Sequence, residues 1–113
     1  MSPPIAEVRI ALFELEAELR RLGFWQAEAP APERLASSVP FCHDTLEFHE
    51  WLQWVFLPRL EAMLASAHLP PFACQIAPLA ELSWEHDGRE VAHAVALLAR
   101  IDDLLGDPAQ RAH

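Results

Sequence analysis

Residues 46–64 read LEFHEWLQWVFLPRLEAML, and this stretch decides the fold. Its large apolar side chains fall into two sectors of a helical wheel that together cover most of the circumference. The sectors hold Phe48, Trp51, Leu52 and Val55 on one side and Leu46, Leu57, Leu60 and Leu64 on the other. A helix that is apolar nearly all round lies in the middle of a domain, so we expect a central helix over residues 45–64.

Two polar features set the ends and the shape of this helix. Asp44 followed by Glu47 has capping-box spacing, so we expect Asp44 to cap the helix. Pro58 lies inside the helical stretch, where its ring clashes with the carbonyl four residues earlier. We therefore expect a kink near Pro58; the alternative is two helices that break at Leu57.

The rest of the chain predicts three more helices joined by two proline-rich connectors. A stripe of apolar residues at steps of three and four begins after Pro3, and Gly23 is placed to end that helix. The expected helices are 3–22, 45–64, 78–86 and 89–105, and the connectors are 24–43 and 66–77. Pro78 is expected at the start of the third helix, Asp87 as the cap of the fourth, and Gly106 at its end.

Composition agrees with a single all-α domain over residues 1–113, arranged as an up-and-down four-helix bundle. Hydrophobic residues make up 52 % of the 113 residues, and the net charge is −9 with no lysine. So few basic groups argue against direct binding to nucleic acids or to anionic membranes. The first residues lack the basic and apolar regions of a signal peptide, and no stretch is suited to span a membrane. We therefore expect a cytoplasmic protein, with Cys42 and Cys74 as buried thiols.

No motif predicts a cofactor, a metal or a catalytic residue. Two groups have the i, i+4, i+7 spacing of metal ligands, but the first begins before the expected cap and Gly88 interrupts the second. The groups are His43, Glu47 and Glu50, and His86, Glu90 and His93. Cys42 stands beside His43, yet adjacent side chains rarely point at one target, so a thiol nucleophile is not expected.

The most informative charge is Arg59, which the helical wheel places inside an apolar sector. Such an arginine requires an acidic partner, for which Glu81 and Glu85 are candidates, or it opens into a cleft that binds an anion or a carboxylate. The candidate pocket or interface comprises Asp44, Glu47, Trp51, Trp54 and Arg59.

The central stretch also resembles a known family. The resemblance rests on Pro40-Phe41, on Asp44 to Phe48, on Glu50 to Leu60, on Leu69-Pro70 and on Ala77-Pro78 to Glu81. These residues resemble the YqcC-like family of short bacterial helical proteins, and the resemblance extends over nearly the whole chain. It implies an all-helical bundle, no established activity, and an association with tRNA pseudouridine synthase C. Residues 79–80 lack the aromatic side chains typical of the family after Ala-Pro.

Three hypotheses about function follow. The first is a non-enzymatic protein-interaction module, accessory to the tRNA-modifying enzyme, whose acidic surface binds a basic partner. The second is a small-molecule binding protein or an enzyme with a cleft near Arg59. The third is a structural homo-oligomer, because the apolar excess of residues 46–64 leaves surface to bury between subunits.

Overall fold

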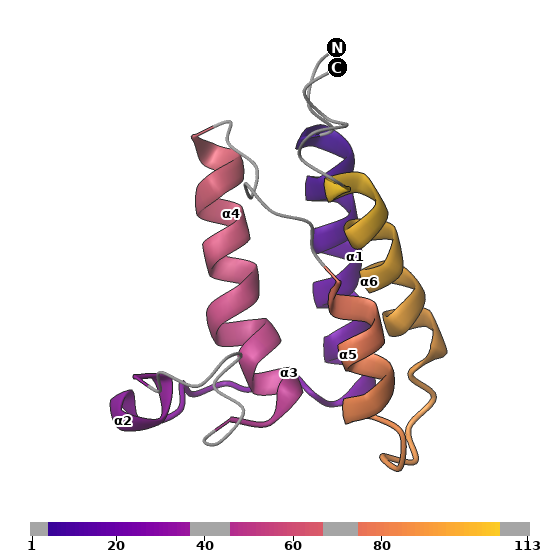
Figure 1. The fold of residues 1–113 in the computed structure, drawn as a ribbon. Helices are drawn as coiled ribbons and strands as arrows, with labels where there is room; N and C mark the ends of the chain where they lie inside the picture. Colours follow the sequence, from indigo (N-terminus) through magenta and orange to yellow (C-terminus); the bar gives the residue numbers. More distant parts are fainter. Residues whose placement is uncertain (1–4, 37–45, 67–74, 107–113) are drawn as a thin grey trace.

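The computed structural model describes residues 5–36, 46–66 and 75–106, and every regular element within these ranges is a helix (Figure 1). The all-α class predicted from the sequence is therefore confirmed. In chain order the elements are α1 (Ile5–Leu22), α2 (Pro32–Leu35), α3 (Phe48–Trp51), the π-helical turn η2 (Leu52–Phe56), α4 (Leu57–Ala65), α5 (Ile76–Ser83) and α6 (Ala92–Leu105). None of these helices is long and apolar enough to cross a membrane.

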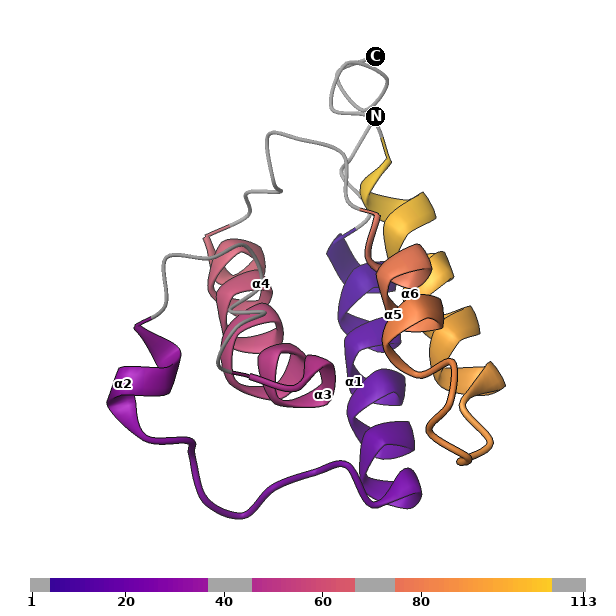
Figure 2. The same cartoon turned by 60° about the horizontal axis from the view of Figure 1, so that its bottom comes forward.

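The helices pack around α1. Helix α1 packs against α6, and α6 also packs against α5. Helix α4 contacts α1 from the opposite side. Figures 1 and 2 both show α1 between α4 and the α5–α6 pair, with the short α2 set apart beside α3 and α4. One hydrophobic core therefore joins α1, α4, α5 and α6.

Helix α1 forms as its apolar periodicity predicts. Val8, Leu12, Leu15 and Leu19 are buried along one face. The helix ends in a Schellman motif, in which Gly23 adopts a φ of 83° and the Phe24 N–H donates to the Leu19 carbonyl at 3.0 Å. The predicted stop at Gly23 is confirmed, and the predicted first residues lie outside the described ranges.

The helix predicted to be central lies beside α1, which takes the middle position instead, and it begins later than predicted. Its N-cap is Glu47, and the backbone N–H of Glu47 donates to the Glu50 carboxylate at 2.9 Å. The capping prediction for Asp44 is thus wrong by three positions, and Asp44 itself lies outside the described residues. The helix starts at Phe48 because the Glu50 side chain accepts the backbone N–H of the N-cap residue, as in a capping box.

A π-helical turn interrupts this helix directly before Pro58. The Leu57 N–H donates to the Leu52 carbonyl, and Pro58 is the second residue of α4. Proline is tolerated in a first turn because its missing N–H has no helical partner there. The kink expected near Pro58 stays a prediction.

The π turn also changes which face the later residues occupy. A turn with one extra residue rotates everything after it by about 100° relative to a continuous α-helix. Leu57, Leu60 and Leu64 therefore join Leu52 on one buried face, although an α-helical wheel assigns them to a second sector. Arg59 is rotated out of the apolar sector and is exposed.

The starts of the last two helices differ from the predictions. Helix α5 begins at Ile76, two residues before Pro78, because the Asp102 carboxylate of α6 accepts the N–H groups of Ile76 and Ala77 at 2.9 and 2.8 Å. Helix α6 begins at Ala92 with Val91 at its N-cap, so the capping prediction for Asp87 is wrong.

Asp87 instead closes the turn before α6. Its carboxylate accepts the Arg89 N–H at 3.2 Å and pairs with the Arg89 guanidinium at 2.8 Å. Gly88 follows Asp87 with a φ of 88°, but α5 already ends at Ser83, three residues before its predicted end at residue 86. Gly106 ends α6, also as predicted.

Candidate functional site

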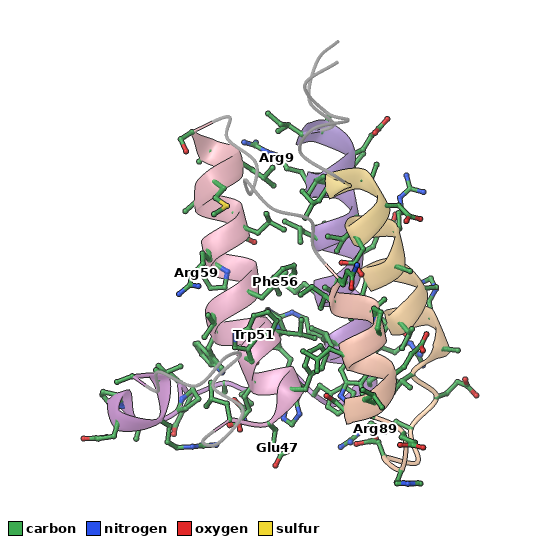
Figure 3. All side chains as sticks on the ribbon, viewed as in Figure 1. Arg9, Glu47, Trp51, Phe56, Arg59 and Arg89 are labelled. Carbon is green, nitrogen blue, oxygen red and sulfur yellow. The ribbon has the colours of Figure 1, made fainter. Side chains whose placement is uncertain are left out.

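The four described residues of the predicted pocket or interface do not line a common groove. Glu47 is an exposed N-cap, and Trp51 is buried among aromatic rings, 5.4 Å from the ring of Phe56. Trp54 is half-buried and Arg59 is exposed, while Asp44 lies outside the described residues. Figure 3 shows Trp51 and Phe56 pointing toward α1 and α5, whereas Arg59 points to the opposite side of the helix.

The prediction that Arg59 is a buried or paired charge is wrong. No residue within 5–36, 46–66 and 75–106 forms an ion pair with Arg59, and the proposed partners Glu81 and Glu85 are themselves exposed. Neither of the two grooves described below is lined by Arg59. The physical reason is the rotation that the π turn imposes before Arg59.

A buried polar network around Gln26 was not predicted. Gln53 makes two hydrogen bonds to the backbone of Gln26: its amide nitrogen donates to the Gln26 carbonyl at 2.7 Å, and its amide oxygen accepts the Gln26 N–H at 2.8 Å. The Gln26 side chain in turn accepts from the indole Nε1 of Trp54 at 2.8 Å. These bonds fix the connector after α1 onto the η2 turn, which is why the connector is ordered there.

Glu50 is the acidic centre of the same network. Its buried carboxylate accepts from Gln26 Nε2 at 3.1 Å, from Arg34 Nη2 at 2.7 Å and from the Glu47 N–H at 2.9 Å. Burial raises the pKa of Glu50, but these three donors outweigh burial and hold the pKa below its ordinary value of 4.5. Glu50 is thus a structural carboxylate. The one sequence signal for the network was a buried-looking glutamine, Gln53, inside an apolar helix.

A shallow groove lies on the outer side of this network. Its volume is about 610 Å³, and its lining includes Trp25, Trp54, Arg20 and Pro58. The Arg20 guanidinium carbon lies 4.6 Å from the centre of the Trp25 ring, and Arg20 also pairs with Glu16 at 3.2 Å. Of the predicted site residues that the structure describes, only Trp54 reaches this groove, and the charge of Arg20 at its edge is balanced by Glu16.

An aromatic cluster fills the end of the core near α3. The ring of Phe24 stacks on Trp84 at 5.1 Å and on His49 at 4.9 Å, and the Arg89 guanidinium covers Phe24 at 4.3 Å. Phe48 meets Trp84 edge-on at 5.2 Å. Burial lowers the pKa of His49 below its ordinary value of 6.5, so this histidine is neutral at physiological pH.

Three buried or half-buried acids, Glu18, Glu50 and Asp102, accept hydrogen bonds from Arg21, from the Gln26 network and from the start of α5. No group of three His, Cys, Asp or Glu side chains within these ranges is placed to hold a metal ion. His86, Glu90 and His93 are all exposed, and His43 lies outside the described residues.

The comparisons place the chain in a family. Residues 7–104 match the family model DUF446, whose description is "tRNA pseudouridine synthase C". The chain belongs to this family. It is 38 % identical to the uncharacterised protein YqcC of Escherichia coli strain K12 over 102 residues. This match covers 90 % of this chain and 94 % of that protein. An uncharacterised protein of Haemophilus influenzae is 41 % identical over 70 residues, 62 % of this chain and 66 % of that protein.

Two further similarities bear on fold and function. The solution NMR structure of YqcC from E. coli superposes on this chain with a TM-score of 0.80 at 36 % identity, covering 94 % of this chain and 91 % of that one. The YqcC-like resemblance is thus confirmed. A protein of Pectobacterium carotovorum named tRNA pseudouridine synthase C is 50 % identical over 60 residues, which are 53 % of this chain but only 16 % of that protein.

Proposed function

We propose that this protein is a non-enzymatic interaction module that binds tRNA pseudouridine synthase C and assists it. The observation that carries the proposal is the match of more than half of this chain to a short part of a protein with that name. A stretch similar to this chain inside a protein of that name supports an interaction with the enzyme, because segments of one chain are held at a high effective concentration of each other.

The charges of the described residues support a protein partner. Four arginines, Arg20, Arg21, Arg34 and Arg89, form ion pairs with acidic neighbours. The chain has only 8 basic residues of the Lys and Arg type against 17 acidic ones, so pairing leaves few free cations for phosphate groups. The remaining acidic surface favours a basic protein, and the tRNA itself is then held by the enzyme.

The proposal includes a scaffold and a compartment. The scaffold is an up-and-down four-helix bundle whose α3–α4 helix bends near Pro58, and the alternating directions of α1, α3–α4, α5 and α6 in Figure 1 support it. The compartment is the cytoplasm, which suits a partner of a tRNA-modifying enzyme.

A binding titration tests the function. The purified chain is titrated into tRNA pseudouridine synthase C from the same organism by calorimetry, at about 0.05 M and about 0.3 M NaCl, where the Debye length falls roughly from 14 Å to 6 Å. We expect a one-to-one complex whose affinity decreases with salt. The absence of any complex at the lower salt concentration refutes the proposal.

A modification assay then separates assistance from binding alone. Turnover of the synthase on its tRNA substrate is measured with and without the chain at saturating concentration. We expect the chain to change the KM for tRNA or the turnover number of the enzyme, and to leave the tRNA unmodified when it is added without the enzyme. Modification by the chain alone contradicts a non-enzymatic role.

A further inference from the structure

Helix α1 has a second apolar stripe on its solvent side. Phe13 and Ile10 are 76 % and 56 % exposed, and together with the exposed Ala6 and Ala17 they recur at steps of four, three and four residues. At 100° per residue, this stripe lies opposite the face that α1 buries in the core. A helix that is apolar on two opposite faces is covered on both sides in its working state.

A groove continues this stripe toward α4. It has a volume of about 360 Å³, and Phe13 and Leu12 of α1 face Leu64 and Glu61 of α4 across it. The Arg9 guanidinium closes one end by donating to the Leu64 carbonyl at 3.2 Å, and Figure 3 shows Arg9 between the two helices. The stripe meets the groove at Phe13, and we call this joined surface the α1 face: Ala6, Ile10, Phe13, Ala17, Leu64 and Glu61.

The charges around the α1 face are acidic. Glu7 and Glu14 are exposed on one flank of the stripe, and Glu61 is exposed on the other side across the groove. Arg20 pairs with Glu16 and Arg21 pairs with Glu18, so among the described residues Arg9, which donates to the Leu64 carbonyl, is the one α1 arginine without a carboxylate partner, against the three carboxylates of Glu7, Glu14 and Glu61. A surface with an apolar centre and an acidic rim complements a helix that carries Lys or Arg beside its apolar anchors.

We propose that the α1 face is the docking surface for a cationic amphipathic helix of the partner protein. The inference rests on the proposed function and adds the location and the chemistry of the contact. Phe13 is the anchor, because it is the most exposed of the large apolar side chains in the described ranges and stands at the mouth of the groove. The small side chains of Ala6 and Ala17 allow the docked helix to approach closely at both ends of the stripe.

A second copy of this chain fits the α1 face less well. In such a dimer the two α1 helices pair antiparallel, with Ile10 of one copy against Phe13 of the other. This pairing also brings together the flanks that carry Glu7 and Glu14. Glu7 of one copy then lies near Glu14 of the other on both sides of the twofold axis, and like charges at an interface disfavour binding. Each copy also carries a net charge of −9, which adds to the repulsion.

The test uses three exposed apolar residues of the same chain. Phe13→Ser and Ile10→Ser alter the α1 face, whereas Leu82→Ser alters a 71 % exposed residue of α5 and is the matched control. In the titration with the synthase we expect Phe13→Ser to weaken binding by about tenfold or more, Ile10→Ser to weaken it less, and Leu82→Ser to leave it unchanged. Melting temperatures of all three variants show whether the fold is intact.

A charge variant and a model peptide complete the test. We expect Glu14→Lys to weaken binding and to reduce its salt dependence. A designed leucine–lysine amphipathic peptide of about 15 residues is expected to bind the wild-type chain, and a leucine–glutamate peptide of the same pattern is not. Phe13→Ser is expected to abolish binding of the lysine peptide.

The outcomes separate the two proposals. If the synthase binds wild type and Phe13→Ser equally well, the α1 face is refuted while the proposed function stands. If the synthase does not bind but the lysine peptide binds in a Phe13-dependent way, the function is refuted while the face stands. Failure of the lysine peptide to bind wild type, or light scattering that shows a dimer abolished by Phe13→Ser, overturns the inference.

Discussion

Replacing Glu50 by Gln tests the polar network most directly. The carboxylate is 4 % exposed and accepts three hydrogen bonds, from Gln26, Arg34 and the Glu47 backbone. Gln keeps the shape of the side chain but offers one acceptor oxygen, and its NH₂ group then faces a donor. At least one buried donor loses its partner, and the remaining bonds lose the assistance of the negative charge.

The size of the effect follows from these contacts. A hydrogen bond to a charged group contributes about 1.5–3 kcal/mol, and the part due to Arg34 is reduced because the Arg34 side chain is 43 % exposed. We therefore expect Glu50→Gln to lower the free energy of unfolding by about 2 kcal/mol. With a urea m-value of about 1.5 kcal/mol/M, the unfolding midpoint falls by roughly 1.3 M.

Urea unfolding at pH 7, followed by circular dichroism and tryptophan fluorescence, measures this shift. The control is Glu81→Gln, which changes an exposed glutamate and is expected to stay within about 0.3 kcal/mol of wild type. A midpoint for Glu50→Gln that coincides with that of Glu81→Gln refutes the assignment of Glu50 as a structural carboxylate.

The same variant makes a pH prediction with a definite sign. The pKa of Glu50 in the folded protein lies below its ordinary value of 4.5, so its ionised form stabilises the fold above that pH. This contribution is lost as the pH falls below 4.5 toward the pKa of the folded state. The difference in stability between wild type and Glu50→Gln is therefore expected to shrink on acidification, and a difference that grows contradicts the reasoning.

Three further predictions concern other elements. Asp102→Ala removes the acceptor of two α5 N–H groups and is expected to destabilise the protein by about 2 kcal/mol in urea unfolding, while Asp103→Ala, at the exposed neighbour, has little effect. Gly23→Ala places a side chain at a φ of 83° and is expected to cost about 1 kcal/mol in thermal unfolding, although no neighbouring atom obstructs it. His49→Phe is expected to lose less stability than wild type as the pH falls below 6.5. Burial lowers the pKa of His49 in the folded state, so protonation favours unfolding of the wild type. Melting temperatures measured against pH test this, and parallel profiles for the two proteins contradict it.

Local signals in the sequence predicted the helices well and their starts less well. The apolar stripe of α1 and the stops at Gly23 and Gly106 depend only on neighbouring residues, and the structure confirms them. The start of α3 also depends on a near neighbour, because Glu50 accepts the N–H of Glu47, but the capping spacing of Asp44 and Glu47 predicted a start three residues too early. The start of α5 depends on a distant group, the Asp102 carboxylate of α6, which nothing near Pro78 in the sequence reveals.

The misplacement of Arg59 has one cause, the π turn. A wheel drawn at 100° per residue splits the apolar residues of 46–64 into two sectors and puts Arg59 in one of them. The turn at Leu52–Phe56 absorbs one residue, so the two sectors merge and Arg59 leaves the merged face. A helix that seems apolar nearly all round is thus a one-sided helix with a change of phase, and this ambiguity is inherent in the pattern.

The polar network was hidden for a different reason. Gln26 and Gln53 are 27 positions apart, and Arg34 and Glu50 are 16 apart, so their pairing depends on how the connector folds back. A glutamine between Leu52 and Trp54 was the visible sign that a buried amide needs a partner. The comparisons add the family and the fold but leave these contacts to the structure.

The Asp102 cap has a consequence for the order of folding. Helix α5 has only eight residues, too few to persist alone in water, and the first N–H groups it must satisfy are held by a side chain from α6. Formation of α5 therefore depends on α6, whose own apolar face is completed by α1. The pairing of the first and last helices is expected to come early along the folding pathway, and α5 to condense onto it after the rate-limiting barrier. Asp102→Ala then speeds unfolding and leaves the folding rate nearly unchanged.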